Sequence, residues 1–442
     1  MSVPTLQQAI DKAGSPIELL WKPGAAPWSV PVVAPEHAGW AAEQEAWRSG
    51  VVLMDLSFHM FDTVFDGPDA TRLLSDVSAN NYESFAVGQA KQFVPVAYDG
   101  NIITDGILLR EAPQRYTLTG VPASQNWVKY HAKTGGYDVE FHTDPDSSVR
   151  TEGDPQLFRF QIQGPQALDL VARAFGGPLP ETKFFHSTMV TLNGVPVRAL
   201  RHGMTGQAGY EFIGDYRHYD VVKEALLGAG EPLGVVHVGG LAYFTNGVES
   251  GWIPTPTPAI YTDERLRGYR EWLPAFSFEG KKPLSGSFYS ENIEDYYISP
   301  WELGYGRSIS FNHDFIGRDA LEASRDEIRR TKVTLEFDDE DVRRVFGEDP
   351  GYRLDYGRFR IERAGELVGV TFWTANIAPV DRILALSLVD TAAATPGTEV
   401  EVVWGEHPGS GAVDPAFERI RATVQLSPYN EFARTSYRTQ RV

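Results

Sequence analysis

Histidines and carboxylates are the side chains with which this 442-residue chain could do acid–base or metal chemistry. Its ten histidines are scattered, and no two have the H-x-x-x-H spacing that places two ligands on one helix face. We therefore expect no metal site. The chain has no cysteine, which excludes disulfides, thiolate nucleophiles, cysteine-ligated zinc and iron–sulfur clusters. It also has no Gly-x-Ser-x-Gly turn, Walker loop or Gly-rich dinucleotide fingerprint.

The excess of acidic over basic residues restricts which macromolecules the protein can bind. Forty basic against 59 acidic residues give a net charge of −19, which opposes binding to nucleic acid or to anionic membranes. Residues 1–20 lack the continuous apolar run of a signal peptide. The uncharged window 232–248 is too short and too polar to span a membrane. We expect a soluble, cytoplasmic protein.

The elements that must position any site fall into about three domains, at roughly 150 residues each. An alternating run at 61–65 leads into Gly67-Pro68, and a similar run at 158–162 leads into Gly164-Pro165. Both read as a strand, a glycine turn and a helix with proline at its first position. The echo favours two related α+β units over chance, although Gly-Pro is a common helix entry.

Further helices are expected near residues 37–48, 124–134 and 219–227, the last with a glycine stop at Gly228 and Gly230. The aromatic-rich segment 252–305 has little periodicity and indicates a long ordered loop or several short elements. From residue 331 short β-like runs predict a β-rich terminal domain, with acidic residues 338–341 as a solvated turn. The expected strands cover residues 92–96, 102–109, 116–120, 195–201, 332–337, 358–363, 367–373, 383–388 and 399–404.

One motif points to a family. Residues 201–212, RHGMTGQAGYEF, resemble the R-x-x-x-T-G-x-x-G-[FY]-E signature of the glycine cleavage T-protein (aminomethyltransferase) superfamily. Gln163-Gly-Pro, DFIGRDAL at 314–321 and GVTFWTANIAP at 369–379 match in order around it. The strings at 242–274 and 292–306 resemble the long central stretch of tetrahydrofolate-dependent aromatic O-demethylases acting on vanillate and syringate. The resemblance covers nearly the whole chain.

This resemblance implies an α+β fold in which two related α+β domains and a β-rich third domain form a ring, with folate in the central channel. We expect the first domain, which binds folate, to comprise residues 1–57 and 150–228. The second domain, with the substrate pocket, should comprise residues 58–149 and 229–328. The β-rich domain should span 329–442.

Five residues are expected to bind tetrahydrofolate. Glu211 matches the pterin-binding acid of the superfamily, since a carboxylate can accept the adjacent N–H and amino group of a pterin; the alternative is a surface glutamate at a strand end. Trp252 and Tyr210 offer apolar faces to the ring system, with core packing as the alternative. Gln163 is a polar contact or a turn cap, and Asp105 lies near the folate-side aspartate of the aminomethyltransferases.

The resemblance also implies the catalytic pair. His59 matches the histidine of the O-demethylases and could donate a proton near neutral pH to the departing aryl oxygen; the alternative is a structural histidine at a strand start. Tyr243 matches a tyrosine lining their substrate pocket and could hydrogen-bond the phenolic or ether oxygen. Because the chain has no thiol, we expect direct transfer to folate, helped by in-line positioning of donor and acceptor.

The expected substrate is a neutral aromatic ether. The vanillate enzymes carry, where this chain has Val121, an arginine that pairs with the substrate carboxylate, and burying an unpaired carboxylate is costly. Leu56 and Phe58 would line an apolar pocket. Arg270 is the alternative cation that could reach in and replace the missing charge.

Several functions stay open. The carbon could come from a methoxy group, giving a phenol and 5-methyl-tetrahydrofolate, or from a methylenedioxy bridge of a sesamin-like lignan, giving a catechol and 5,10-methylene-tetrahydrofolate. A vanillate- or syringate-type demethylase of an aromatic acid is the alternative. A glycine-cleavage aminomethyltransferase, which needs a lipoyl carrier protein, is disfavoured by the aromatic insert, so no carrier is expected. The folate-binding protein of iron–sulfur maturation carries a motif cysteine that is missing here.

Overall fold

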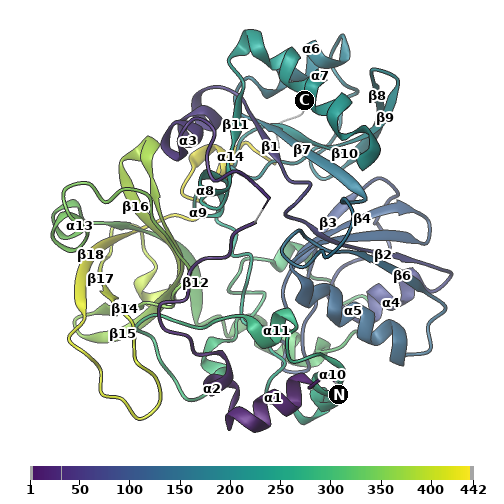
Figure 1. Cartoon of the computed structure of the whole chain (residues 1–442). Helices are drawn as coiled ribbons and strands as arrows, with labels where there is room; N and C mark the ends of the chain where they lie inside the picture. Colours follow the sequence, from purple (N-terminus) through teal and green to yellow (C-terminus); the bar gives the residue numbers. More distant parts are fainter. Residues whose placement is uncertain (1–2, 31, 439–442) are drawn as a thin grey trace.

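Three lobes surround the middle of the molecule in the computed structural model of the chain (Figure 1). The structure describes residues 3–30 and 32–438. Each lobe is built on its own β-sheet, so side chains from separate stretches of sequence can meet where the lobes face one another. Within the described residues, no helix is long and apolar enough to cross a membrane.

The first lobe has a six-stranded sheet in the order β11-β1-β7-β10-β9-β8. Its strands are β1 (Val52–Asp55), β7 (Leu157–Gln163), β8 (Ser187–Leu192), β9 (Val195–Leu200), β10 (Gly209–Asp215) and β11 (Val236–Val238). Helices α6 (Ala167–Phe175) and α7 (Tyr219–Gly230) supply residues to the apolar core of this sheet. β1 runs antiparallel to β7 and parallel to β11. β11, which follows α7, is the edge strand of this sheet.

The second lobe has a five-stranded sheet in the order β3-β4-β5-β2-β6. Its strands are β2 (Phe61–Asp66), β3 (Ala90–Phe93), β4 (Gly106–Ala112), β5 (Arg115–Gly120) and β6 (Glu140–Asp144). Helices α4 (Ala70–Asp76) and α5 (Pro122–Thr134) pack on it. Backbone hydrogen bonds from Ala90 to Phe185 O (2.7 Å) and from Ser187 to Gly88 O (2.7 Å) join this lobe to the first.

Two segments lie outside the domains expected for them. Helices α1 (Leu6–Ala13) and α2 (Pro16–Leu20) pack into the core of the second lobe rather than the first, because their apolar residues are buried against α10 (Arg267–Trp272) and α11 (Phe278–Lys281). β11, expected in the second domain, pairs with β1 of the first sheet. The division into three domains at the expected boundaries otherwise stays a prediction.

The two echoed turns have the same backbone requirement. Gly67 (φ 151°) and Gly164 (φ 125°) both have positive φ. A Cβ at Gly67 would lie 2.3 Å from Asp138 O, and one at Gly164 would lie 2.5 Å from Gly50 O. Only glycine fits such positions. Helices α4 and α6 begin later than expected, so each proline lies before the N-cap residue rather than at the first helical position.

The third lobe is a closed barrel. The order β15-β14-β17-β18-β12-β16 closes through pairing of β16 with β15, and β13 adds to β15 at the edge. The strands are β12 (Arg330–Phe337), β13 (Leu354–Asp355), β14 (Arg360–Arg363), β15 (Glu366–Ile377), β16 (Arg382–Asp390), β17 (Glu399–Trp404) and β18 (Glu418–Gln425). The acidic residues 338–341 are not a solvated turn: Asp338 accepts hydrogen bonds from the backbone of Glu340 and Asp341 and starts α13 (Asp339–Phe346).

Short helices occupy the remaining segments. They are α3 (Trp40–Ser49), α8 (Gly240–Tyr243), α9 (Asn246–Ser250), α12 (Arg318–Ala323) and α14 (Glu431–Thr435). The aromatic-rich segment 252–305 contains α10, α11 and single 3₁₀ turns, which fits the expected set of short elements. α7 continues through Gly228, so that glycine is not a stop, and it ends at Gly230 as expected; Gly234, with φ 67°, ends the 3₁₀ turn that follows α7.

Candidate active site

Glu211 lies on the central strand β10, and the sheet register fixes its neighbours. It pairs with Gln161 on β7, while Gly209 pairs with Gln163 and Ile213 with Arg159. Because side chains alternate along a strand, Glu211 shares one face of the sheet with the side chains of Arg159, Gln161 and Gln163. This face carries polar groups, and the opposite face packs on α6 and α7.

A buried charge cluster joins this face to the second lobe. Arg159 Nη1 donates to Glu211 Oε1 at 2.6 Å. Its Nη2 lies 3.0 Å from both carboxylate oxygens of Asp62 on β2 and donates to Thr119 Oγ1 on β5, also at 3.0 Å. The exposed fractions of the side chains are 5% for Arg159, 8% for Asp62 and 10% for Glu211. One guanidinium therefore holds a carboxylate from each of two lobes.

Groups with unused hydrogen-bonding capacity surround Glu211. His202 Nδ1 lies 3.7 Å from Glu211 Oε2, too far for a hydrogen bond, and its ring stacks on Phe185 with centroids 5.1 Å apart. Burial lowers the pKa of His202. Gln161 Nε2 donates to the His202 carbonyl at 2.8 Å, whereas Gln161 Oε1 is buried without a hydrogen-bond partner among the described residues.

Two expected folate residues have other contacts. Tyr210 precedes Glu211 on β10, so its side chain points to the opposite face, where it is buried in the core of the first lobe beside Phe212. This placement favours the core-packing alternative. Gln163 accepts from the backbone N–H of Met204 at 2.8 Å and donates to Thr205, which ties the signature loop to β7. Its amide thus caps that loop.

Asp105 and Trp252 meet in a second polar cluster. Asp105 Oδ2 accepts from Trp252 Nε1 at 2.6 Å, from the hydroxyl of Tyr305 at 2.6 Å, and from Gln92. Asp105 Oδ1 is buried without a partner in the described part of the chain. Burial raises the pKa of Asp105 to about 6, although these hydrogen bonds and the nearby Lys332 of the barrel oppose the rise.

His59 and Tyr243, the expected catalytic pair, lie side by side. Their ring centroids are 4.4 Å apart, and Phe244 lies 5.7 Å from His59. His59 lies in the turn between β1 and β2, and Tyr243 ends α8, so the pair joins segments far apart in the sequence. Within the residues described, neither ring nitrogen of His59 makes a hydrogen bond of good geometry, and the Tyr243 hydroxyl contacts Met204 Sδ at 3.9 Å.

Burial sets the protonation of this pair. It lowers the pKa of His59 from 6.5 to about 4, and the carboxylate of Asp55 offsets only part of that effect. His59 is therefore neutral at pH 7, contrary to the expectation of a proton held near neutrality. Burial, with the nearby charge of Glu211, raises the pKa of Tyr243 well above its usual value of 10. At neutral pH both residues therefore offer a hydrogen-bond donor but no net charge.

The expected substrate residues separate in the structure. Leu56 is buried in the cluster that contains Tyr243, Met204 and Phe244. Phe58, which lies in the turn after β1, instead packs edge-on against Tyr216 and Tyr219, with ring centroids 6.2 Å and 6.1 Å apart. We therefore remove Phe58 from the expected pocket.

Val121 precedes α5 and lies one residue beyond the Phe61–Gly120 pair, at the end of the second sheet where β2 begins, two residues after His59. Arg270 does not replace the missing charge. Its Nε donates to Gln7 at 2.6 Å, and its Nη1 donates to the carbonyls of Ile260 and Asp263 at 2.9 Å and 2.8 Å.

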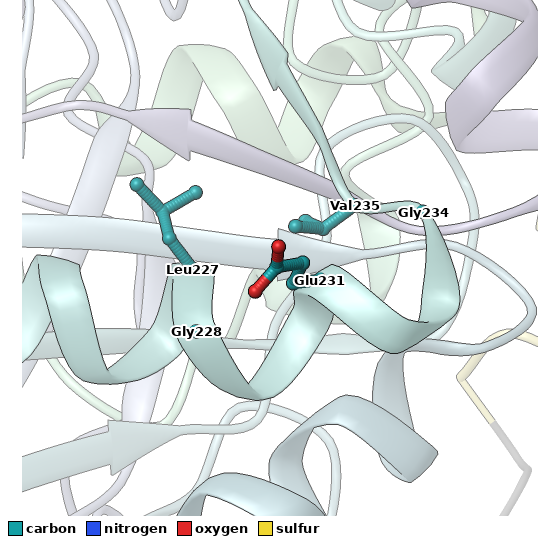
Figure 2. Close-up of a pocket in the computed structure, with 5 residues that line it drawn as sticks. All are labelled: Leu227, Gly228, Glu231, Gly234 and Val235. Atoms are coloured by element: carbon teal, nitrogen blue, oxygen red, sulfur yellow. The ribbon is translucent and has the colours of Figure 1, made fainter.

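Several site residues had no signal in the sequence. Arg159, Asp62 and Gln161 are ordinary strand residues until the register brings them to Glu211. The Tyr437 hydroxyl accepts a hydrogen bond from the backbone N–H of Gly203 at 2.6 Å and so ties the segment after α14 to the signature loop, residues 201–212. The pocket in Figure 2, at the end of α7 and the turn that follows it, contains none of these groups; it is lined by Leu227, Gly228, Glu231, Gly234 and Val235.

Comparisons with known proteins agree with this architecture. A family profile described as GCVT N-terminal domain matches residues 23–256. A syringate O-demethylase of Sphingobium is 38% identical, covering 98% of this chain and 97% of that protein. A sesamin methylene transferase of Sinomonas is 28% identical over 89% of each chain. An aminomethyltransferase of Streptomyces coelicolor is 27% identical, over 84% of this chain and 86% of that one.

A solved structure superposes on almost the whole chain. The crystal structure of the glycine cleavage system aminomethyltransferase T from Bartonella henselae superposes with a TM-score of 0.64 at 20% identity, covering 97% of this chain and 99% of that one. The expected T-protein-like fold of two α+β lobes and a β-rich third is thereby confirmed. The chain belongs to the GCVT family, the family of the glycine cleavage T-protein.

Proposed function

We propose that this protein transfers a one-carbon unit from a neutral aromatic ether to tetrahydrofolate. The observation that carries this proposal is the uncharged His59–Tyr243 pair, packed in an apolar cluster beside Glu211. The names of the relatives support the reaction class, because two of them are an O-demethylase and a methylene transferase.

The polar groups around Glu211 and Asp105 fit a folate. Gln161 Oε1 and Asp105 Oδ1 are buried acceptors without partners in the described chain, and Glu211 keeps lone pairs beyond its bond to Arg159. Such orphaned acceptors are costly unless a ligand supplies donors. Glu211 and Gln161 would bind the edge of the pterin that carries the N–H and amino group. Trp252 and Asp105 would bind the adjoining part of the tetrahydrofolate. Bound tetrahydrofolate supplies a nucleophilic nitrogen, N5, that accepts the carbon.

The residues near the ether would assist departure of the aryl oxygen. Transfer of a methoxy methyl group breaks one C–O bond and forms one C–N bond at N5, and the proton lost by N5 ends on the phenol oxygen. Transfer of a methylenedioxy carbon breaks two C–O bonds and forms two C–N bonds, at N5 and N10, and the two protons lost by these nitrogens end on the two catechol oxygens. His59 and Tyr243 would donate hydrogen bonds to the oxygen as negative charge develops on it. Positioning of donor and acceptor in line supplies a further part of the rate.

The charges that act on the catalytic pair favour a neutral substrate. Asp55 acts on His59 and Glu211 acts on Tyr243, so the charges that shift the pKa values of the pair are negative. The cations beside these two carboxylates, Lys223 and Arg159, are already paired with them. A carboxylate on the substrate would be repelled there, and neither Val121 nor Arg270 provides a cation. The alternative is an aromatic acid, which the name of the syringate O-demethylase favours.

The two substrate classes can be separated by kcat/KM. Guaiacol and 1,2-methylenedioxybenzene serve as neutral ethers, and vanillate and syringate serve as acids, each with tetrahydrofolate under anaerobic conditions. We expect higher kcat/KM for one of the neutral ethers. A clear preference for vanillate or syringate would overturn the neutral-substrate assignment and favour the aromatic-acid alternative. Turnover without tetrahydrofolate would overturn the folate-dependent reaction.

A further inference from the structure

The ion pairs of Arg159 have no role in the reaction proposed above. Its guanidinium lies between two carboxylates from different lobes, Asp62 on β2 and Glu211 on β10. The cluster holds one positive and two negative charges, and all three side chains are buried. Placing such a net charge in the interior is unfavourable unless hydrogen bonds compensate for it. The distribution of those bonds between the two carboxylates is unequal.

Asp62 has several donors. It accepts from Arg159 Nε at 3.3 Å, from Nη2 at 3.0 Å on both oxygens, and from the hydroxyl of Thr119. Glu211 accepts a single bond, from Arg159 Nη1 at 2.6 Å, among the hydrogen bonds of residues 3–30 and 32–438. Arg159, which lies on β7 beside Glu211, thus reaches across to Asp62 of the second lobe and binds only one oxygen of Glu211, which leaves Glu211 Oε2 without a hydrogen bond among the described residues.

We infer that Arg159 is a positioning residue for folate binding: anchored by Asp62 and Thr119, it fixes the carboxylate of Glu211 so that its free lone pairs face the pterin. This inference rests on the proposed function and adds a residue to it. A charge-assisted bond at this distance defines the orientation of the carboxylate. The same bridge ties the sheets of the two lobes together, so the orientation of Glu211 depends on how these lobes sit against each other.

A double-mutant cycle on folate affinity tests the inference. The variants are Arg159→Met, Glu211→Gln and both together, with Kd measured by anaerobic calorimetry for tetrahydrofolate and for 6-methyltetrahydropterin, which lacks the aminobenzoyl-glutamate tail. Since hydrogen bonds to charged groups contribute about 1.5–3 kcal/mol, Arg159→Met should weaken binding about 10- to 100-fold. In the Glu211→Gln background the same change should weaken it less than about 3-fold. Both ligands should show this coupling.

Arg270→Met is the matched control, because Arg270 is equally buried and holds α1 and the 260–263 segment away from Glu211. Its effect on affinity should be small and the same in both backgrounds. If Arg159→Met fails to fold, Arg159→Lys takes its place, since it keeps the charge but loses the fork that reaches both carboxylates.

Equal fold-losses for Arg159→Met in both backgrounds would overturn the positioning role and leave the proposed function intact. Unchanged or improved affinity in that variant would overturn it too. A Glu211→Gln variant with normal affinity would overturn it together with the role of Glu211. Absence of tetrahydrofolate binding by the wild type would instead contradict the proposed function itself.

Discussion

Acidification should destabilise the protein through His59. Burial lowers the pKa of its imidazole from 6.5 to about 4, so between these pH values the unfolded chain binds a proton that the folded chain does not. The free energy of unfolding therefore falls as the pH drops from 6.5 to 4. Above pH 6.5 His59 is neutral in both the folded and the unfolded chain, so its stabilising contribution is fully present there. A pKa difference of about 2.5, at about 1.4 kcal/mol for each pKa unit, lowers the free energy of unfolding by at most about 3.5 kcal/mol.

The assay compares wild type with His59→Gln by urea unfolding between pH 7.5 and 4. The difference between the two curves removes the effect of other buried histidines, such as His131 and His237, whose pKa burial also lowers to about 4. The wild type should lose more stability on acidification than the variant. Parallel curves, or an NMR titration of the folded His59 imidazole near pH 6.5, would refute the reasoning. With His59 neutral, kcat should also not fall as the pH rises through 6.5.

Three substitutions test other parts of the site. Glu211→Gln should weaken tetrahydrofolate binding by about 1.5–3 kcal/mol in calorimetry with the fold intact, and unchanged affinity would remove Glu211 from the pterin site. His59→Ala should lower kcat about 10²- to 10⁴-fold with little change in folate Kd; a kcat within a few-fold of wild type would leave Tyr243 as the main donor. Val121→Arg should raise kcat/KM for vanillate relative to guaiacol, and no change in that ratio would place Val121 outside the pocket.

Local sequence patterns predicted where helices, strands and turns lie better than which of these elements pack or pair with one another. The turns at Gly67 and Gly164 could be predicted because a strand, a glycine and a helix follow each other within a few residues. The partner of β11 could not be predicted, since its pairing with β1 joins residues almost two hundred positions apart. The packing of α1 and α2 on the second lobe could not be predicted either, because it depends on contacts with α10 and α11, which are distant in sequence.

The site shows the same limit. Glu211 was found through a motif confined to a few residues, and the structure places it on the polar face of a central strand. Tyr210, its neighbour in the motif, points into the core because strand side chains alternate. Arg159 and Asp62 could not be predicted, because their charges meet only when two sheets from separate lobes come together. The low pKa of His59 likewise comes from burial by segments distant in sequence.

The most direct test of the proposed reaction follows the transferred carbon. Guaiacol labelled with ¹³C in its methoxy group, and 1,2-methylenedioxybenzene labelled in its bridge, are each incubated anaerobically with the protein and tetrahydrofolate, and ¹³C NMR identifies the labelled product. We expect the label on folate for at least one substrate, as 5-methyl- or 5,10-methylene-tetrahydrofolate, with one equivalent of catechol formed. Label that stays on both aromatic ethers, or catechol released without labelled folate, would contradict one-carbon transfer from a neutral ether to tetrahydrofolate.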